Sequence, residues 1–167
     1  NELSKCKDFL NAEFRHYCIS IITTRLAVKN RDSTLCDSIL LELRPECQTA
    51  VAVTALDLAL CDKAVGEPTS DRFTVPTCIG EIAAVKGDAS YCEKITTAAY
   101  PGECLRKVAI ATKNLALCQT LYKGREIKDH RFWCHTRYAV ENEEAQVCQE
   151  ITEPTYRDGC YKEVAKN

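Results

Sequence analysis

The sequence predicts an all-α protein: an α/α solenoid of six disulfide-stapled helical hairpins that forms a single domain over residues 1–167. Three observations lead to this prediction. Twelve cysteines recur along the chain at similar short intervals. Apolar side chains follow them at helical spacing. The whole pattern repeats about every 56 residues, which divides the chain into three double units.

The cysteines indicate structural disulfides in an oxidising space. No Cys-x-x-Cys pair is present, so the spacing of zinc ribbons, thioredoxin-type redox sites and iron–sulfur clusters is missing. Because disulfides persist outside the cytoplasm, we expect an extracellular or periplasmic protein that is secreted through a cleaved signal peptide. No apolar run has the length of a membrane span.

The first cysteine of each pair predicts a short helix. In four units the residue four positions before it is a good N-cap, namely Asp32, Asp57, Asp88 and Asn114. An apolar side chain stands three positions after it in every unit: Phe9, Ile39, Ala64, Ile95, Leu121 and Ile151.

The second cysteine of each pair predicts a helix that packs closely against a neighbour. Four positions after it stand Ile22, Val51, Ile82, Val108, Tyr138 and Val164. A small residue follows each of these: Thr23, Ala52, Ala83, Ala109, Ala139 and Ala165. The connections between the two helices carry the breakers Pro45, Gly66-Glu67-Pro68, Pro76, Pro101-Gly102, Gly124 and Pro154. Pro45 and Pro101 suit the first turn of the second helix.

Two disulfide pairings fit this pattern. Adjacent pairing joins the two helices of one hairpin: Cys6–Cys18, Cys36–Cys47, Cys61–Cys78, Cys92–Cys104, Cys118–Cys134 and Cys148–Cys160. The rival pairing joins each second helix to the next first helix, as in Cys47–Cys61, and its separations along the chain are steadier. We favour the adjacent pairing, because a bridge between antiparallel helices tolerates connections of different length.

The motifs Leu-Cys-x-x-Ile and Cys-x-x-x-Val-Ala, on the first and second helix, resemble those of tetratricopeptide-type solenoids. They are more similar to the cysteine-rich secreted helical-hairpin repeat proteins of bacteria and archaea. The units are shorter than a tetratricopeptide repeat of about 34 residues and lack its Trp/Gly/Tyr signature. The resemblance implies a structural or interaction role and transfers no functional residue.

Few residues suggest chemistry. His16, His130 and His135 have no spacing that favours a metal, and we expect His130 and His135 at a polar surface helix start. We expect no catalytic residue, no cofactor and no enzyme activity. Acidic and basic residues number 24 and 22 and are interleaved, which argues against nucleic acid as a partner. We expect Tyr91 and Tyr138 in the core.

The best candidate contact surface in the sequence is Phe132-Trp133. The expected function is that of a structural subunit that joins copies of itself head to tail into an extracellular filament or tube. Three double units of the repeat nearly equal the whole length of the chain. The alternative is a secreted or periplasmic tetratricopeptide-like module that binds a peptide or another protein. Polar capping repeats at both ends would favour the binding module over the filament subunit. The first and last helices do not decide between the two.

Overall fold

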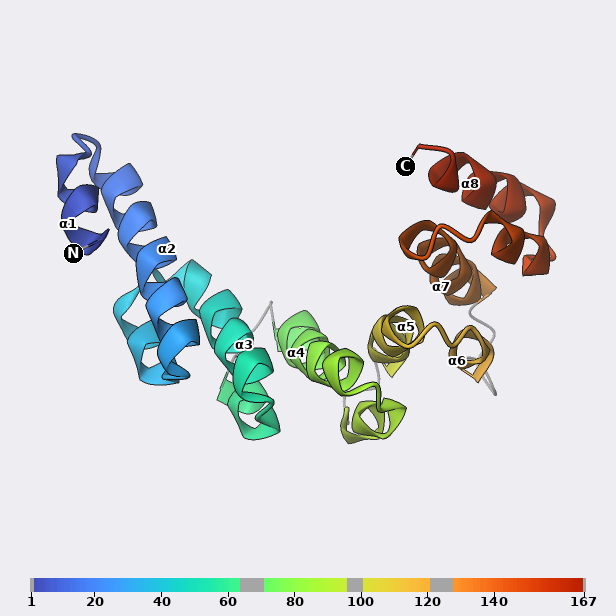
Figure 1. Cartoon of the computed structure of the whole chain (residues 1–167), viewed down its shortest axis with the longest axis horizontal. Helices are drawn as coiled ribbons and strands as arrows, with labels where there is room; N and C mark the ends of the chain where they lie inside the picture. The colour runs from blue at the N-terminus through green and yellow to red at the C-terminus, as the bar shows by residue number, and fades with distance from the viewer. Residues whose placement is uncertain (1, 64–70, 96–100, 121–127, 167) are drawn as a thin grey trace. The chain divides into compact units, whose positions relative to one another are not determined.

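The structure is a computed structural model that describes residues 2–63, 71–95, 101–120 and 128–166, and all regular structure in these ranges is helical (Figure 1). This confirms the all-α prediction. The α-helices are α1 (Glu2–Lys5), α2 (Ala12–Asn30), α3 (Arg44–Ala55), α4 (Asp71–Lys86), α5 (Pro101–Ala111), α6 (Ala116–Thr120), α7 (Lys128–Glu141) and α8 (Pro154–Val164). The 3₁₀ helices are η1 (Cys6–Asp8), η2 (Ser33–Ser38), η3 (Leu41–Leu43), η4 (Leu58–Lys63), η5 (Ala89–Lys94) and η6 (Ala145–Glu150).

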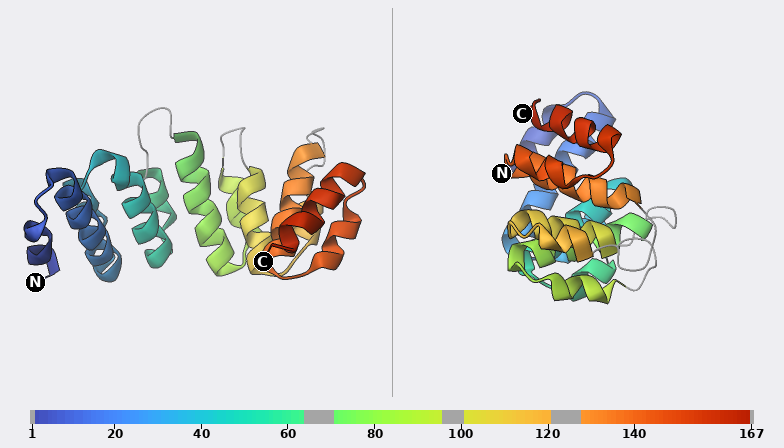
Figure 2. Two further views of the ribbon diagram at one scale, coloured as in Figure 1. Left: turned by 90° about the horizontal axis from the view of Figure 1, so that it is seen from above. Right: turned by 90° about the vertical axis from the view of Figure 1, so that its right-hand side faces the viewer.

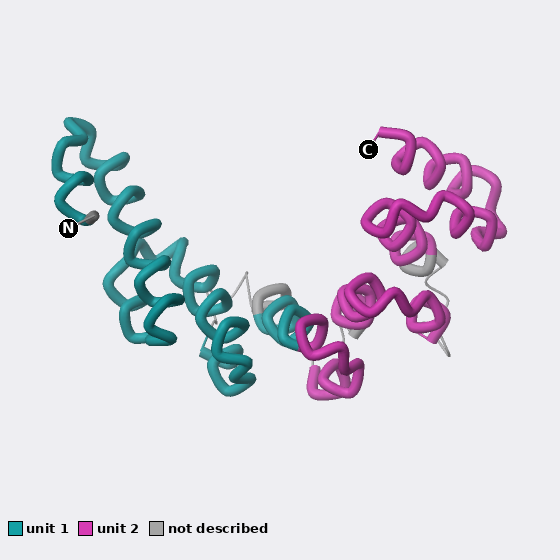
Figure 3. Tube along the Cα trace, in the orientation of Figure 1, with its two compact units in different colours: residues 1–82 teal, residues 83–167 magenta. Residues whose placement is uncertain are grey.

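The chain divides into two compact units, residues 1–82 and 83–167 (Figure 3). The division falls within α4. In the first unit α2 contacts η2 and lies beside α3 (Figures 1 and 2). In the second unit α7 packs against both α8 and η6. None of the described helices is long and apolar enough to cross a membrane.

Six disulfides join each short helix to the α-helix that follows it. The bridges are Cys6–Cys18, Cys36–Cys47, Cys61–Cys78, Cys92–Cys104, Cys118–Cys134 and Cys148–Cys160. This is the adjacent pairing, with Cα–Cα distances of 5.6 to 5.8 Å. We call each such unit of two helices and one bridge a bridged pair.

Five α-helices end in the same left-handed turn. The residue in that turn has a φ of 52° to 65°, and it is Arg31, Leu56, Gly87, Lys113 or Glu143. At the end of α2 the amide of Asp32 donates to the carbonyl of Ala27, and the amide of Arg31 donates to that of Val28. The same two bonds close α3, α4, α5 and α7. They make a Schellman motif, which satisfies carbonyls that a helix end leaves unpaired.

The residue after this turn begins the next short helix. The carboxylates of Asp32, Asp57 and Asp88 accept a hydrogen bond from the amide two residues later, at 2.9 to 3.0 Å. These caps confirm the positions that the sequence predicts for helix starts. At Glu144, where the sequence has a poorer cap, the side chain makes no such bond.

The short helices differ from expectation in type. Four of the bridged pairs begin with a six-residue 3₁₀ helix, namely η2, η4, η5 and η6, rather than with an α-helix. In η2, η5 and η6 an isoleucine three positions after the cysteine donates its amide to the cysteine carbonyl and ends the helix. A segment so short, fixed by a cap at one end and a bridge near the other, fits the tighter 3₁₀ turn.

The core of the first unit lies where one bridged pair meets the next. Ala27 of α2 packs with Cys36, Ile39, Cys47 and Val51 of the following pair, and all five are buried. The segment from Cys18 to Cys36 is longer than the equivalent segments of later pairs, and the extra residues lengthen α2 by about one turn. Ala27 thereby takes the place that Ala52 has in α3.

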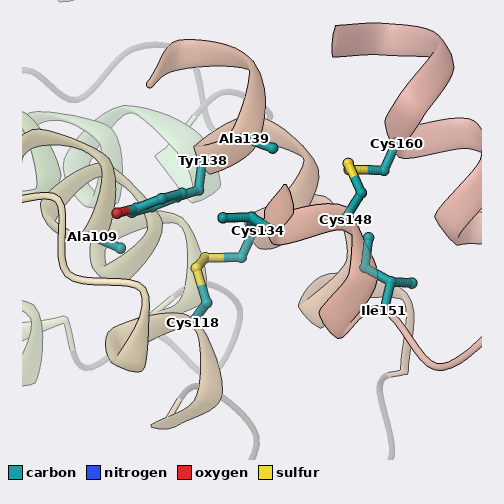
Figure 4. Close-up of a cluster of buried hydrophobic side chains, with 9 residues drawn as sticks. Ala109, Cys118, Cys134, Tyr138, Ala139, Cys148, Ile151 and Cys160 are labelled. Carbon is teal, nitrogen blue, oxygen red and sulfur yellow. A yellow bond between two sulfur atoms is a disulfide. The ribbon is translucent and has the colours of Figure 1, made fainter. Parts of the chain in front are cut away.

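The core of the second unit follows the same pattern, as Figure 4 shows. The ring of Tyr138 extends toward Ala109, and both lie in one cluster with the Cys118–Cys134 bridge. Ala139 of α7 packs in the same cluster as Ile151 and Cys160 of the last bridged pair.

Prolines stand in the first turn of three of the longer helices. Pro45 stands in the first turn of α3, as the sequence predicts, and α5 and α8 begin at Pro101 and Pro154. Pro76 was expected in a connection but lies inside α4. It is the sixth residue of that helix, so the hydrogen bond that it cannot donate would reach only the second residue. The expected positions Ala64, Gly66–Pro68, Leu121 and Gly124 lie outside the described residues.

Candidate functional site

The cysteines have no nucleophilic role in this state. All twelve are in bridges, so no thiolate is present. Eleven of them are buried, and Cys18 is half-buried. They form much of the packing between helices instead.

His135 is buried, which corrects the expectation of a surface position. It is 2% exposed on α7, and its Nε2 lies 3.7 Å from a carboxylate oxygen of Glu150 at the end of η6. Gln119 of α6 donates to the same carboxyl group at 3.4 Å. The position faces inward because α7 packs against both α6 and η6. The histidine therefore helps to join two bridged pairs.

The other histidines do not extend this cluster into a site. His16 is exposed on α2, and the side chain of His130 lies outside the described residues. Within the described ranges, no three His, Cys, Asp or Glu side chains come together as a metal site would require.

The predicted contact surface Phe132-Trp133 is partly open. Phe132 is half-buried and stacks on Tyr156 of α8, with ring centroids 4.6 Å apart. Trp133 lies 5.2 Å from Phe132 at a tilt of 54°, and 54% of it is exposed. Phe132 thus joins α7 to α8, and only Trp133 offers most of its surface to a partner.

Tyr91 differs from its expected place in the core. It is half-buried, and its ring lies 5.0 Å and 5.2 Å from the ammonium groups of Lys86 and Lys94. Its hydroxyl also accepts a hydrogen bond from Lys86 at 2.8 Å. Tyr138, by contrast, is buried as expected.

A larger apolar surface lies near the start of the chain. Half of the exposed large hydrophobic side chains in the described residues fall between residues 9 and 21. We name this group the N-terminal apolar surface, and its members are Phe9, Leu10, Phe14, Tyr17 and Ile21. The last three follow one stripe of α2 at a spacing of three and four residues.

Local structure holds the N-terminal apolar surface in place. The side chain of Asn11 accepts hydrogen bonds from the amides of Glu13 and Phe14 and so starts α2. The guanidinium of Arg15 donates twice to the carbonyl of Phe9, at 2.9 and 3.2 Å. The loop before α2 is therefore fixed to the first turn of that helix.

No sequence-based prediction includes this surface, although the sequence carries a signal for it. In later bridged pairs the position of Tyr17 is taken by Glu46, Thr77, Glu103, Trp133 and Gly159. The position of Ile21 is taken by Glu81, Lys107, Arg137 and Glu163 in four of them. An apolar side chain at Ile21, where four later pairs have a charged one, marks a surface with a separate role.

Titration is perturbed at caps and in the core. The pKa of Asp32 is lowered because the hydroxyl and then the amide of Thr34 donate to its carboxylate. Ser90 lowers the pKa of Asp88 in the same way. Burial, followed by the nearby charge of Glu144, raises the pKa of Tyr138. These shifts belong to the helix starts and the core rather than to a reactive centre.

Comparison with family models, curated proteins and solved structures finds no match for this chain.

Proposed function

We propose that this chain is a non-enzymatic structural protein of an oxidising space outside the cytoplasm. In this proposal its six bridged pairs are the hairpins of one tetratricopeptide-like α/α solenoid. The chain is the subunit of an extracellular filament or tube in which copies join head to tail. It takes no cofactor, and its partner is itself.

The repeated junction supports the solenoid. Five helices end in the same Schellman turn, and three of the short helices that follow are capped by an aspartate. Because each junction turns the chain by the same local geometry, successive hairpins would stack in one direction.

The observation that carries the assembly is the N-terminal apolar surface. Leu10 is fully exposed and Phe14 is 62% exposed. A protein that is monomeric in solution rarely exposes several large apolar side chains in one region. The side chains of this surface are apolar, so they favour association through an apolar contact.

The oligomeric state tests this proposal. The oxidised chain, at rising concentration, is measured by multi-angle light scattering and viewed by negative-stain electron microscopy. We expect a mass that grows with concentration and particles that extend in one direction. A chain that stays monomeric throughout would contradict the proposal.

The alternative is a secreted or periplasmic module that binds a peptide or another protein. The exposure of Trp133 beside the stacked Phe132 favours it, because aromatic residues are enriched where interfaces form. Trp133 is the single tryptophan, so its emission would report a partner that covers this position. A monomeric chain whose emission shifts with added peptide would favour this alternative.

A further inference from the structure

We propose that the side of the first bridged pair that carries Phe9, within the N-terminal apolar surface, receives the last bridged pair of a second copy, with Ala165 of that copy at the centre of the contact. The inference rests on the proposed function, because it names the two surfaces that a head-to-tail joint would use. Its evidence is a comparison of equivalent positions in successive bridged pairs.

The position three residues after the first cysteine gives the first comparison. Ile39, Ile95 and Ile151 occupy it in later bridged pairs and are 5%, 8% and 7% exposed. Phe9 occupies it in the first pair and is 47% exposed. The side chain is larger and more apolar than a solvated position needs, and nothing in the described residues buries it as the isoleucines are buried.

The position four residues after the second cysteine gives a second comparison. Val51, Ile82, Val108 and Tyr138 are buried there, whereas Ile22 of the first pair and Val164 of the last are only half-buried. The clear difference is therefore at Phe9, whose equivalents in the described later pairs are buried, and Ile22 is also less buried than its equivalents in the four middle pairs. The open side of the first pair is the side by which later pairs pack on the helix before them.

The structure shows what closes that side in later pairs. In the first unit Ile39 and Val51 pack against Ala27 of the preceding helix. In the second unit Ile151 packs in one cluster with Ala139 of the preceding helix. In later pairs this side is therefore covered by the carboxyl end of an α-helix. That end presents a small residue, which lets a branched or aromatic side chain approach the helix backbone.

Among the described residues, the end of α8 leaves that small residue exposed. Ala52, Ala83, Ala109 and Ala139 are fully buried, but the equivalent Ala165 after α8 is exposed. Tyr161, one turn earlier on α8, is also exposed. A second copy therefore carries a surface of the kind that internal contacts of this fold already use, and the proposed joint continues that established interface.

Two variants test the joint, one for each surface. The variant Phe9→Glu/Phe14→Glu places charges on the N-terminal apolar surface. The variant Ala165→Arg places a bulky charge on the other surface of the proposed joint, at the end of α8. Matched controls are Leu41→Glu and Val85→Glu, which alter side chains that are 55% and 63% exposed elsewhere. All of these positions are exposed, so each variant should fold; circular dichroism and the mass of the six-bridge form check this.

We expect each test variant to weaken self-association by at least about 100-fold, because its joint would bury an unpaired charge. The controls should assemble like the unchanged chain. A mixture of the two test variants should form a complex of two chains and no larger one, because each variant keeps one working surface.

The outcomes separate this inference from the proposed function. If the unchanged chain assembles and both test variants assemble equally well, the joint is elsewhere and the filament proposal stands. If Ala165→Arg still forms dimers while the Phe9/Phe14 variant does not, the apolar surface pairs with itself and the head-to-tail joint is wrong. If the unchanged chain stays monomeric, the joint and the proposed function both fail.

Discussion

At the scale of single residues, the left-handed turns at the helix ends carry a conformational cost. Only one of the five positions has glycine, Gly87, whereas Arg31, Leu56, Lys113 and Glu143 occupy the others. A residue with a Cβ is disfavoured in this conformation, and two backbone hydrogen bonds hold it there.

Lys113→Gly should therefore stabilise the protein by about 0.5–1 kcal/mol, which is the relief of the left-handed strain less the entropy that glycine loses on folding. Urea unfolding followed by circular dichroism measures the difference. Lys113→Ala is the matched control and should give no gain, because alanine retains the Cβ. Equal stability of the glycine and alanine variants would contradict this explanation.

The aspartate caps predict how acid acts on the fold. The pKa values of Asp32 and Asp88 lie below the ordinary 3.8, so both carboxylates bind protons more readily in the unfolded chain. Their contribution to stability is complete above the unfolded pKa and is lost as the pH falls through the lower folded pKa.

The variant Asp32→Asn/Asp88→Asn should retain the caps, because asparagine also accepts from the amide two residues later. Between about pH 5 and pH 2 it should lose less stability than the unchanged protein. Thermal unfolding across that range measures the two slopes. Parallel slopes would show that the acid sensitivity arises from other carboxyl groups.

At the scale of elements, each bridged pair depends on its disulfide. A six-residue 3₁₀ helix such as η2 is too short to persist alone, because nucleating a helix is unfavourable. The Cys36–Cys47 bridge closes a separation of 11 residues and fixes η2 against α3.

Replacing Cys36 and Cys47 together by alanine should lower the free energy of unfolding by about 3 kcal/mol, the value expected for a loop of this size. Denaturant unfolding gives that difference, and mass mapping must show the other five bridges intact. A loss below about 1 kcal/mol would mean that packing of Ile39 and Val51 alone holds η2 in place.

The sequence predicts the elements unevenly, and the reasons are physical. The caps at Asp32, Asp57 and Asp88 and the proline starts of α3 and α5 are local signals, so they place those helix ends correctly. Over a helix as short as η2, a period of about 3.0 and one of about 3.6 look alike, so the 3₁₀ form stays hidden.

The sequence also predicts the candidate site only in part, because burial depends on contacts between separate elements. Burial of His135 depends on α6, α7 and η6 meeting in space, which no local pattern reveals. Its acidic contact, Glu150, lies on η6, a separate element further along the chain. The exposure of Phe9 likewise follows from what packs beside it, and the pattern alone makes it equivalent to the buried Ile39.

At the scale of the whole molecule, half-cystines replace much of an ordinary apolar core. Nearly half of the buried hydrophobic residues in the described part of the chain are cysteines. Few large side chains are wholly enclosed there; Ile82, Val51 and Val108 are among them. The six bridges are consistent with an oxidising environment, because reducing compartments do not maintain them.

Reduction should consequently unfold the chain at room temperature. Six bridges that close separations of 11 to 17 residues each contribute up to about 3 kcal/mol. Their sum exceeds the net stability of about 5–15 kcal/mol that is usual for a folded domain. The measurement is circular dichroism of the oxidised chain and of the reduced chain with its thiols alkylated under mild conditions. We expect strong helical signal and cooperative melting only in the first, and a reduced chain that keeps both would show that apolar contacts such as those around Val51 suffice.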